Sequence, residues 1–143
     1  MSQGSMTPTY FQEILDKYDR VALTGVVMSG KSLLLDNVTA DRVILHTDSL
    51  KERGVPFNES PGVVLDELAR VPRFVVAGMQ VPRALRKGLE VDVAVWVNDP
   101  REHLTSRQLS FSNGVRGIFH EWWSTHREVP VHFVDYAVHE DGR

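Results

Sequence analysis

The sequence predicts an α/β fold of three layers, in which helices cover both faces of a parallel sheet. Several short runs of consecutive apolar residues are typical of strands that are buried on both faces. Segments with helical spacing of apolar residues separate each run from the next, as in βαβ units. A chain of 143 residues is long enough for one such domain. We therefore expect a single domain over residues 7–143, and we set residues 1–6 aside as a tag or a disordered N-terminus.

Five segments rich in β-branched and other apolar residues are expected to form the strands. They span residues 21–24, 42–47, 74–77, 91–97 and 131–138. The first four strands are followed by glycine or a polar residue, namely Gly25, Asp48, Gly78 and Asn98. Since ligands of parallel sheets bind at the carboxyl ends of the strands, these positions mark the edge at which we expect function.

The expected helices are bounded by capping residues, prolines and glycines. They cover residues 10–18, 32–37 and 51–53, the stretch from Pro61 to before Pro72, residues 82–87, a helix that starts at Pro100, and residues 115–123. Ser60 is the expected N-cap before Pro61, and Asp99 has the same role before Pro100. Asn113-Gly114 is expected to interrupt the last helical stretch.

Composition and charge exclude several classes of function. The chain has no Cys, which removes disulfides, thiolate metal sites and thiol nucleophiles. A formal net charge of -3 argues against broad binding to a phosphate backbone, although it does not exclude a local basic groove. No apolar stretch is long enough for a membrane span. We expect a cytoplasmic protein without a membrane partner.

A complete Walker A motif runs from Gly25 to Ser32, with the pattern of Gly, any four residues, Gly, Lys, and Ser or Thr. Glycines allow backbone N–H groups to surround phosphate oxygens, Lys31 supplies a positive charge, and the Ser32 hydroxyl can coordinate Mg²⁺. The motif lies between a predicted strand and a predicted helix, as nucleotide binding requires. The alternative is a glycine-rich turn that binds nothing.

With this loop and this order of elements, the sequence resembles the small P-loop kinases. This group includes nucleoside and nucleotide kinases, shikimate-type kinases and polynucleotide-kinase-like ATPases. The resemblance implies a five-stranded parallel sheet in the order 2-3-1-4-5, ATP as co-substrate and Mg²⁺ as cofactor. It also implies an ATP site that comprises Gly25, Met28, Ser29, Gly30, Lys31, Ser32, Leu33 and Arg116. Met28 is a departure, because family members usually have another glycine in this loop.

Asp48 and Arg53 resemble an acceptor-binding pair of these kinases. In the family, a carboxylate at this place accepts the proton of the acceptor hydroxyl or helps to hold magnesium, and an arginine shortly after it binds the acceptor. By this resemblance Asp48 is a catalytic and substrate-binding residue and, with Ser32, a metal ligand, while Lys31 is the catalytic cation of the loop. The alternative is that Asp48 caps the next short helix.

The third predicted strand carries no acidic residue at its end, where many relatives have a Walker B carboxylate. Either Asp48 and water hold the magnesium ion, or the chain binds nucleotide without turnover. After this strand, Gln80 and Arg83 resemble the residues with which nucleotide kinases hold the acceptor base or phosphate. The alternative for Arg83 is a solvated face shared with Arg86 and Lys87.

Residues 99–116 fall at the position of the mobile lid of this family. Lid arginines close over the transferring phosphoryl group and stabilise its charge. Arg107 resembles the catalytic lid residue and Arg116 a second one, with Asn113-Gly114 as the hinge. The alternative for each arginine is a surface position on an amphipathic helix.

These features predict an ATP-dependent kinase that moves the γ-phosphoryl group to a hydroxyl or phosphate of a small acceptor, foremost a nucleoside or nucleotide. One alternative is a kinase that acts on nucleic-acid ends or on bases in DNA. The net charge slightly disfavours it, and a basic groove leading to Asp48 would favour it. Another alternative is a nucleotide-binding switch without phosphotransfer.

Overall fold

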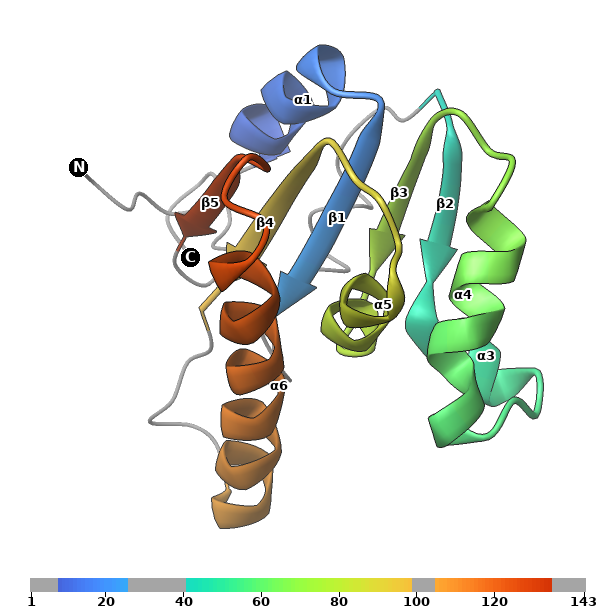
Figure 1. Ribbon diagram of the computed structural model, residues 1–143, viewed down its shortest axis with the longest axis vertical. Helices are drawn as coiled ribbons and strands as arrows, with labels where there is room; N and C mark the ends of the chain where they lie inside the picture. The colour runs from blue at the N-terminus through green and yellow to red at the C-terminus, as the bar shows by residue number, and fades with distance from the viewer. Residues whose placement is uncertain (1–7, 26–40, 99–104, 135–143) are drawn as a thin grey trace.

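The computed structural model describes residues 8–25, 41–98 and 105–134. Within them, five parallel strands form one sheet in the order β2-β3-β1-β4-β5 (Figure 1). The strands are β1 (Arg20–Gly25), β2 (Val43–His46), β3 (Phe74–Ala77), β4 (Val93–Val97) and β5 (Val131–Val134). The parallel sheet and the strand order that the resemblance implied are therefore confirmed.

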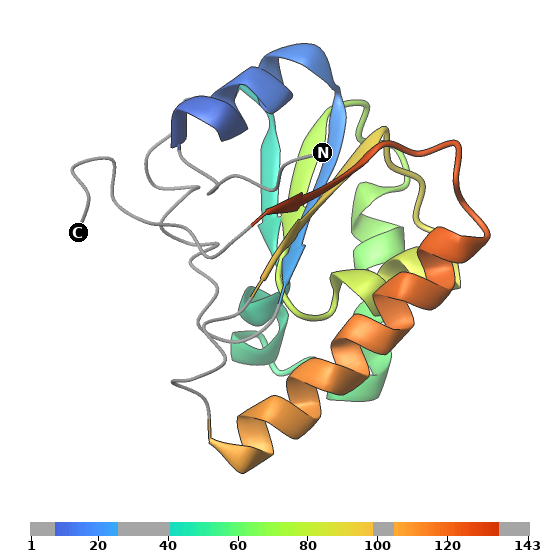
Figure 2. The same cartoon turned by 90° about the vertical axis from the view of Figure 1, so that its left-hand side faces the viewer.

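Helices cover both faces of this sheet. They are α1 (Pro8–Lys17), α3 (Thr47–Glu52), α4 (Ser60–Leu68), α5 (Val81–Lys87) and α6 (Ser106–Ser124), with a 3₁₀ turn η1 (Phe57–Glu59) before α4. Figure 2 shows α1 on one face of the sheet and α4, α5 and α6 on the other. No helix in the described part of the chain is long and apolar enough to cross a membrane.

The core consists of two layers because successive strand residues point to opposite faces. On one face, Val21 and Leu23 of β1 pack in a cluster with Phe11 and Leu15 of α1. On the other face, a second cluster contains Trp96 of β4 together with residues of α4, α5 and α6. Every residue of β3 and β4 is buried. The runs of consecutive apolar residues therefore belong to strands covered on both sides.

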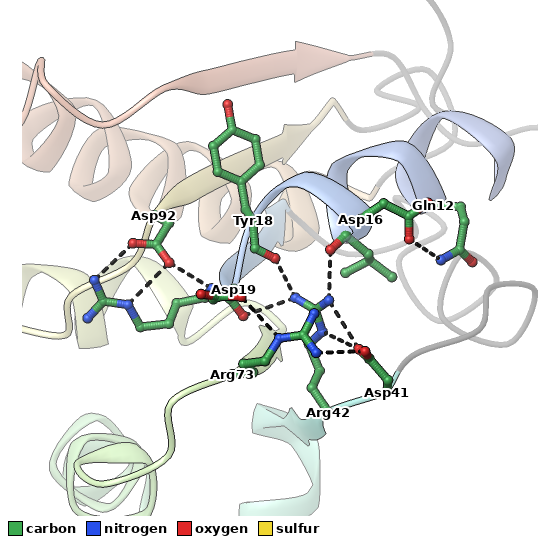
Figure 3. A network of polar contacts seen from close by, with 10 residues as sticks. Gln12, Asp16, Tyr18, Asp19, Asp41, Arg42, Arg73 and Asp92 are labelled. Carbon is green, nitrogen blue, oxygen red and sulfur yellow. Dashed lines mark hydrogen bonds and ion pairs between the residues drawn. The ribbon is translucent and has the colours of Figure 1, made fainter.

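Three arginines fix the edge at which the strands begin, as Figure 3 shows for Arg42 and Arg73. Arg20 pairs with Asp92, and Arg73 pairs with both Asp19 and Asp41. Arg42 donates to the backbone oxygen of Leu15 at 2.7 Å and to that of Tyr18 at 2.6 Å. These carbonyls belong to the end of α1, where a helix lacks partners for its last C=O groups. The cations at this edge are thus satisfied by the fold itself.

The expected start of α4 is wrong by one residue. Ser60 has helical backbone angles, and its N–H bonds the carbonyl of Pro56. The residue at the N-cap is Glu59, and it makes no side-chain capping bond. The turn η1 precedes the helix directly, so its carbonyls supply the partners that a capping side chain would otherwise provide.

The predicted interruption at Asn113-Gly114 is also wrong, because α6 is continuous from Ser106 to Ser124. Ser112, Val115, Phe119 and Trp122 form a buried stripe that continues on both sides of the exposed Gly114. Glycine in a helix costs about 1 kcal/mol, and burying Val115 and Phe119 contributes roughly 2 kcal/mol each. Packing therefore outweighs the local preference.

The helix α6 begins at Ser106 in the described part of the chain. Thr105 is its N-cap and forms a capping box with Gln108. Thr105 Oγ1 accepts from the N–H of Gln108 at 3.2 Å, and Gln108 Oε1 accepts from the N–H of Thr105 at 2.9 Å. The expected cap and start at Asp99 and Pro100 lie outside the described residues. So do the predicted helix 32–37 and the end of the predicted strand 131–138.

Candidate functional site

A cavity of 420 Å³ opens at the edge where the strands end, beside β2 and β3. We call it the Asp48 cavity. Its walls come from α3, from the turn η1 and the start of α4, from the segment after β3, and from α6. The lining residues are Thr47, Asp48, Lys51, Val55, Phe57, Ser60, Met79, Gln80 and Phe111. Two residues that the sequence singled out, Asp48 and Gln80, thus meet in one cavity of ligand-binding size.

Asp48 lies in the first turn of α3, directly after β2. The helix runs from Thr47 to Glu52 and therefore begins before the predicted turn at 51–53. His46 occupies the N-cap and makes no side-chain capping bond, so the interpretation of Asp48 as the cap is wrong. Asp48 is exposed and is the carboxylate of the cavity wall. It is placed to contact a ligand.

Gly78 holds the ends of three strands together at the floor of this site. It has φ 137°, and a Cβ there would overlap Thr47 Oγ1. Its carbonyl accepts from Thr24 Oγ1 at 3.2 Å, and its N–H donates to the carbonyl of Leu23 at 3.2 Å. The missing acid after β3 therefore has a local reason, since position 78 has no room for any side chain.

Two buried oxygens in the cavity wall have no hydrogen-bond partner among the described residues. They are Thr47 Oγ1 and Gln80 Oε1. Gln80 is 8% exposed and Thr47 is 2% exposed. A buried polar atom without a partner costs about 1–3 kcal/mol. A shift of either side chain toward the cavity would let a ligand or a water molecule supply the missing partner.

Arg83 lies next to this cavity rather than in its wall. Its guanidinium carbon is 4.9 Å from the centre of the Phe57 ring and 6.0 Å from that of Phe111. Its Nη1 atom is buried without a partner in the described chain. Burial lowers the pKa of Arg83, and the positive charge of Arg86 lowers it further. Arg83 lines a neighbouring cavity instead, and Phe57 lines both that cavity and the Asp48 cavity.

Arg53 is not brought to the Asp48 cavity. Its Nη2 atom lies 2.7 Å from Oε2 of Glu67 on α4, and a second bond of 3.3 Å joins Nη1 to Oε1. Arg53 does not line the cavity wall. Its predicted role in acceptor binding would require this ion pair to open.

The two predicted lid arginines lie on different sides of α6. Arg107 is exposed, and it lies one turn before Phe111 on the same face of the helix. Arg116 is half-buried, with its guanidinium carbon 5.5 Å from the centre of the Trp96 ring. Nine residues are two and a half turns, so these side chains leave α6 in opposite directions. The structure does not bring them together.

Only the first residue of the Walker A motif belongs to the described chain. Gly25 is buried at the end of β1, and its register partner on β4 is Val97. β1 is the central strand, so the loop starts between the ends of β3 and β4. The remaining predicted ATP-site residues of the loop lie outside the described residues: Met28, Ser29, Gly30, Lys31, Ser32 and Leu33.

Sequence reasoning missed several residues of the cavity. Lys51 follows Asp48 by nearly one helical turn, and Met79 follows the strand-end glycine directly. These positions could have been read from the end-of-strand rule. Phe57 and Phe111 could not, because their rings meet only in the fold, with centroids 6.4 Å apart.

Comparison with known proteins adds no family assignment. No protein-family model and no curated protein matches this chain. Within the described residues, no group of three or more His, Cys, Asp or Glu side chains could hold a metal ion. The chemistry of the site therefore has to be argued from its residues.

Proposed function

We propose that this chain is an ATP-dependent phosphotransferase whose acceptor binds in the Asp48 cavity. The observation that carries the proposal is the joint position of the Walker A start and of Asp48. Gly25 ends the central strand, and Asp48 follows β2 at the same edge of the sheet. Nucleotide sites of open parallel sheets lie at this edge. A phosphate loop and a carboxylate beside a cavity are sufficient equipment for phosphoryl transfer.

In this proposal the roles follow from residue chemistry. Lys31 and the loop N–H groups bind the β- and γ-phosphates. The acceptor oxygen bonds to the γ-phosphorus as the bond from that phosphorus to the bridging oxygen of ADP breaks, and Asp48 takes the acceptor proton. Gln80 lines the acceptor cavity, and its amide binds the acceptor once the buried oxygen turns toward the cavity. Phe111 is the residue of α6 that lines the cavity. Arg107 lies on the same face of this helix and is the cation of α6 nearest to Phe111 in the sequence.

The donor set of the site fits Mg²⁺ that arrives with ATP. This ion prefers oxygen ligands, keeps several waters, and binds through one or two carboxylates and the substrate phosphates. Asp48 supplies one carboxylate, and Thr47 beside it has an unpartnered buried oxygen. Asp48 and Ser32 would hold the ion, which neutralises charge on the phosphates when bound.

The test is transfer of radiolabelled phosphate from ATP to a panel of nucleosides, nucleoside monophosphates and single-stranded oligonucleotides. Lys31→Ala should abolish nucleotide binding. Asp48→Asn should keep nucleotide binding and lower kcat by about 10²–10⁴-fold. The matched control is Asp66→Asn, which changes an exposed carboxylate of α4 outside the cavity. If no acceptor is labelled by the unaltered protein, the proposal is wrong.

A second candidate function is nucleotide binding without transfer. The strand that ends at Ala77 has no acid there, and Gly78 leaves no space for one. A switch of this kind would bind ATP, would lose binding in Lys31→Ala, and would show no turnover that depends on Asp48. Measurement of ATP affinity beside turnover for the same variants separates the two functions.

A further inference from the structure

A second cavity of 360 Å³ shares one lining residue, Phe57, with the Asp48 cavity. Its lining residues are Phe57, Asn58, Pro61, Arg83, Arg86 and Lys87. We call it the cation groove, because three of these six side chains are cationic and none is a carboxylate. The three cations come from one helix, α5, and Asn58 adds an amide from η1. The groove therefore offers a concentrated positive charge to a ligand.

The cations of the groove differ from the arginines that hold the described elements together, although Lys51 and Arg70 also form no ion pair there. Arg20, Arg53 and Arg73 each pair with at least one carboxylate. The side chains of Arg83, Arg86 and Lys87 form no ion pair or hydrogen bond with any described residue. Arg83 has a buried nitrogen without a partner, and the neighbouring charge that lowers its pKa is that of another cation, Arg86. An anion in the groove would relieve this repulsion.

Packing brings the three side chains to the same groove. A Cβ at Gly62 of α4 would lie 3.6 Å from Cε of Lys87, so the lysine chain passes over α4 next to Pro61. Arg83 lies over the Phe57 ring, with its guanidinium carbon 4.9 Å from the ring centre. Phe57 is 54% exposed and lines both the groove and the Asp48 cavity. An exposed aromatic ring thus adjoins a line of cations.

These observations also decide the size of the ligand. Each cavity has the volume of one small ligand, and Phe57 is the one lining residue that they share. A ligand that fills both cavities therefore passes Phe57 and is larger than a ligand that fills one of them, such as a single nucleoside. Phosphates on a cationic groove with a base stacked on an aromatic ring form the usual binding mode of single-stranded nucleic acid.

We propose that the cation groove binds the phosphodiester backbone of a nucleic-acid strand whose acceptor group enters the Asp48 cavity, with a base stacked on Phe57. The inference rests on the proposed phosphotransferase function for the identity of the acceptor. The binding of the strand itself needs no ATP. The net charge of -3 does not oppose it, because the acidic residues are absent from the groove. A nucleic-acid strand has further phosphates beyond the nucleotide in the Asp48 cavity, and the cations of the groove would bind these phosphates. A free nucleotide has none for them to bind.

The experiment measures binding of a fluorescein-labelled single-stranded oligodeoxynucleotide by anisotropy across a salt series without ATP. For a single strand, each phosphate contact contributes about 0.7 to the slope of log K against log salt. Arg86→Gln and Lys87→Gln should each reduce the slope by about 0.7 and weaken binding. The matched control is Arg70→Gln, which removes an exposed arginine outside both cavities and should leave the slope unchanged.

Two further arms distinguish the strand from other anions. Phe57→Leu should weaken oligonucleotide binding about tenfold, since it removes the stacking surface, and should leave binding of inorganic polyphosphate unchanged. A nucleoside monophosphate should compete at least tenfold more weakly than the strand. Equal slopes for Arg86→Gln and Arg70→Gln would overturn the inference. The inference is also overturned if a nucleoside monophosphate competes as well as the oligonucleotide does. The same holds if Phe57→Leu weakens the binding of polyphosphate as much as the binding of the oligonucleotide.

Failure of this inference and failure of the proposed function give different results. If the protein phosphorylates a free nucleoside but its binding of the oligonucleotide does not depend on Arg86, the proposed function holds and the inference about the groove is wrong. A protein that binds the strand through Arg86 and Lys87 but transfers no phosphate to any acceptor keeps the binding site and loses the phosphotransferase.

Discussion

Arg20 and Asp92 are joined by two side-chain hydrogen bonds at the edge where the strands begin. Arg20 Nη2 donates to Oδ1 at 2.9 Å, and Nε donates to Oδ2 at 3.3 Å. The backbone N–H of Arg20 also donates to Oδ2, at 2.9 Å. One carboxylate therefore fixes both the side chain and the first residue of β1. These bonds from Arg20 lower the pKa of Asp92, and partial burial opposes the effect.

This contact predicts a pH-dependent stability. A carboxylate with a lowered pKa in the folded state stabilises the protein above its unfolded-state pKa of about 3.9, and the contribution is lost as pH falls through the folded-state pKa. Asp92→Asn should lower the free energy of unfolding by about 1–2 kcal/mol at neutral pH. In urea unfolding, the difference from the unaltered protein should shrink toward pH ~3. A difference that is the same at both pH values would contradict the assignment, and Asp66→Asn is the control.

The glycines at positions 78 and 114 should respond in opposite directions to replacement by alanine. Gly78→Ala places a side chain at φ 137° and against Thr47, so we expect a loss of at least about 2 kcal/mol in unfolding free energy. At Gly114, inside α6, a Cβ would meet nothing within 4 Å. Gly114→Ala should therefore stabilise the protein by about 0.5–1 kcal/mol. Thermal unfolding of both variants checks the pair, and a stabilised Gly78→Ala would refute the strained geometry.

The capping box of α6 predicts a local loss of stability. Thr105→Ala removes the acceptor for the N–H of Gln108 and should cost about 1 kcal/mol. The neighbouring Ser106 is exposed and has no capping role, so Ser106→Ala should be nearly neutral. Chemical unfolding followed by far-UV circular dichroism measures both. Equal losses for the two variants would show that the box contributes nothing.

Gln80 offers a test that separates stability from ligand binding. Its buried oxygen has no partner in the described structure, so Gln80→Met should leave the unfolding free energy unchanged or raise it by up to about 1 kcal/mol. The same change should raise KM for the acceptor about tenfold, because it removes the polar contact in the Asp48 cavity. A variant that loses stability with an unchanged KM would mean that the amide supports the fold instead.

Much of the fold could be predicted because its signals are local. The buried runs of β3 and β4 and the prolines and glycines around α5 mark these elements in the sequence itself. The interruption at Gly114 was predicted wrongly, because its cost depends on what Val115 and Phe119 bury against the sheet. Such tertiary packing has no signature within a few residues of the glycine.

The candidate site was predictable only in part. Asp48 and Gln80 could be found because they follow strands, and parallel strands end at one edge. The pairing of Arg53 with Glu67 was not foreseen, since it depends on how α3 meets α4. The ring of Phe111 comes to Phe57 from another helix, so no spacing in the sequence indicates this part of the wall of the Asp48 cavity.

The division between paired and unpaired cations has a consequence for how this protein can change over evolutionary time. Replacing Arg20 or Arg73 breaks contacts that hold strands and helices in place. Replacing Arg86 or Lys87 breaks no ion pair within the described chain and relieves crowding of like charge. Single substitutions in the groove can therefore accumulate without loss of folding. The ligand preference of the groove can change in this way while the ion pairs that hold the strands and helices are kept.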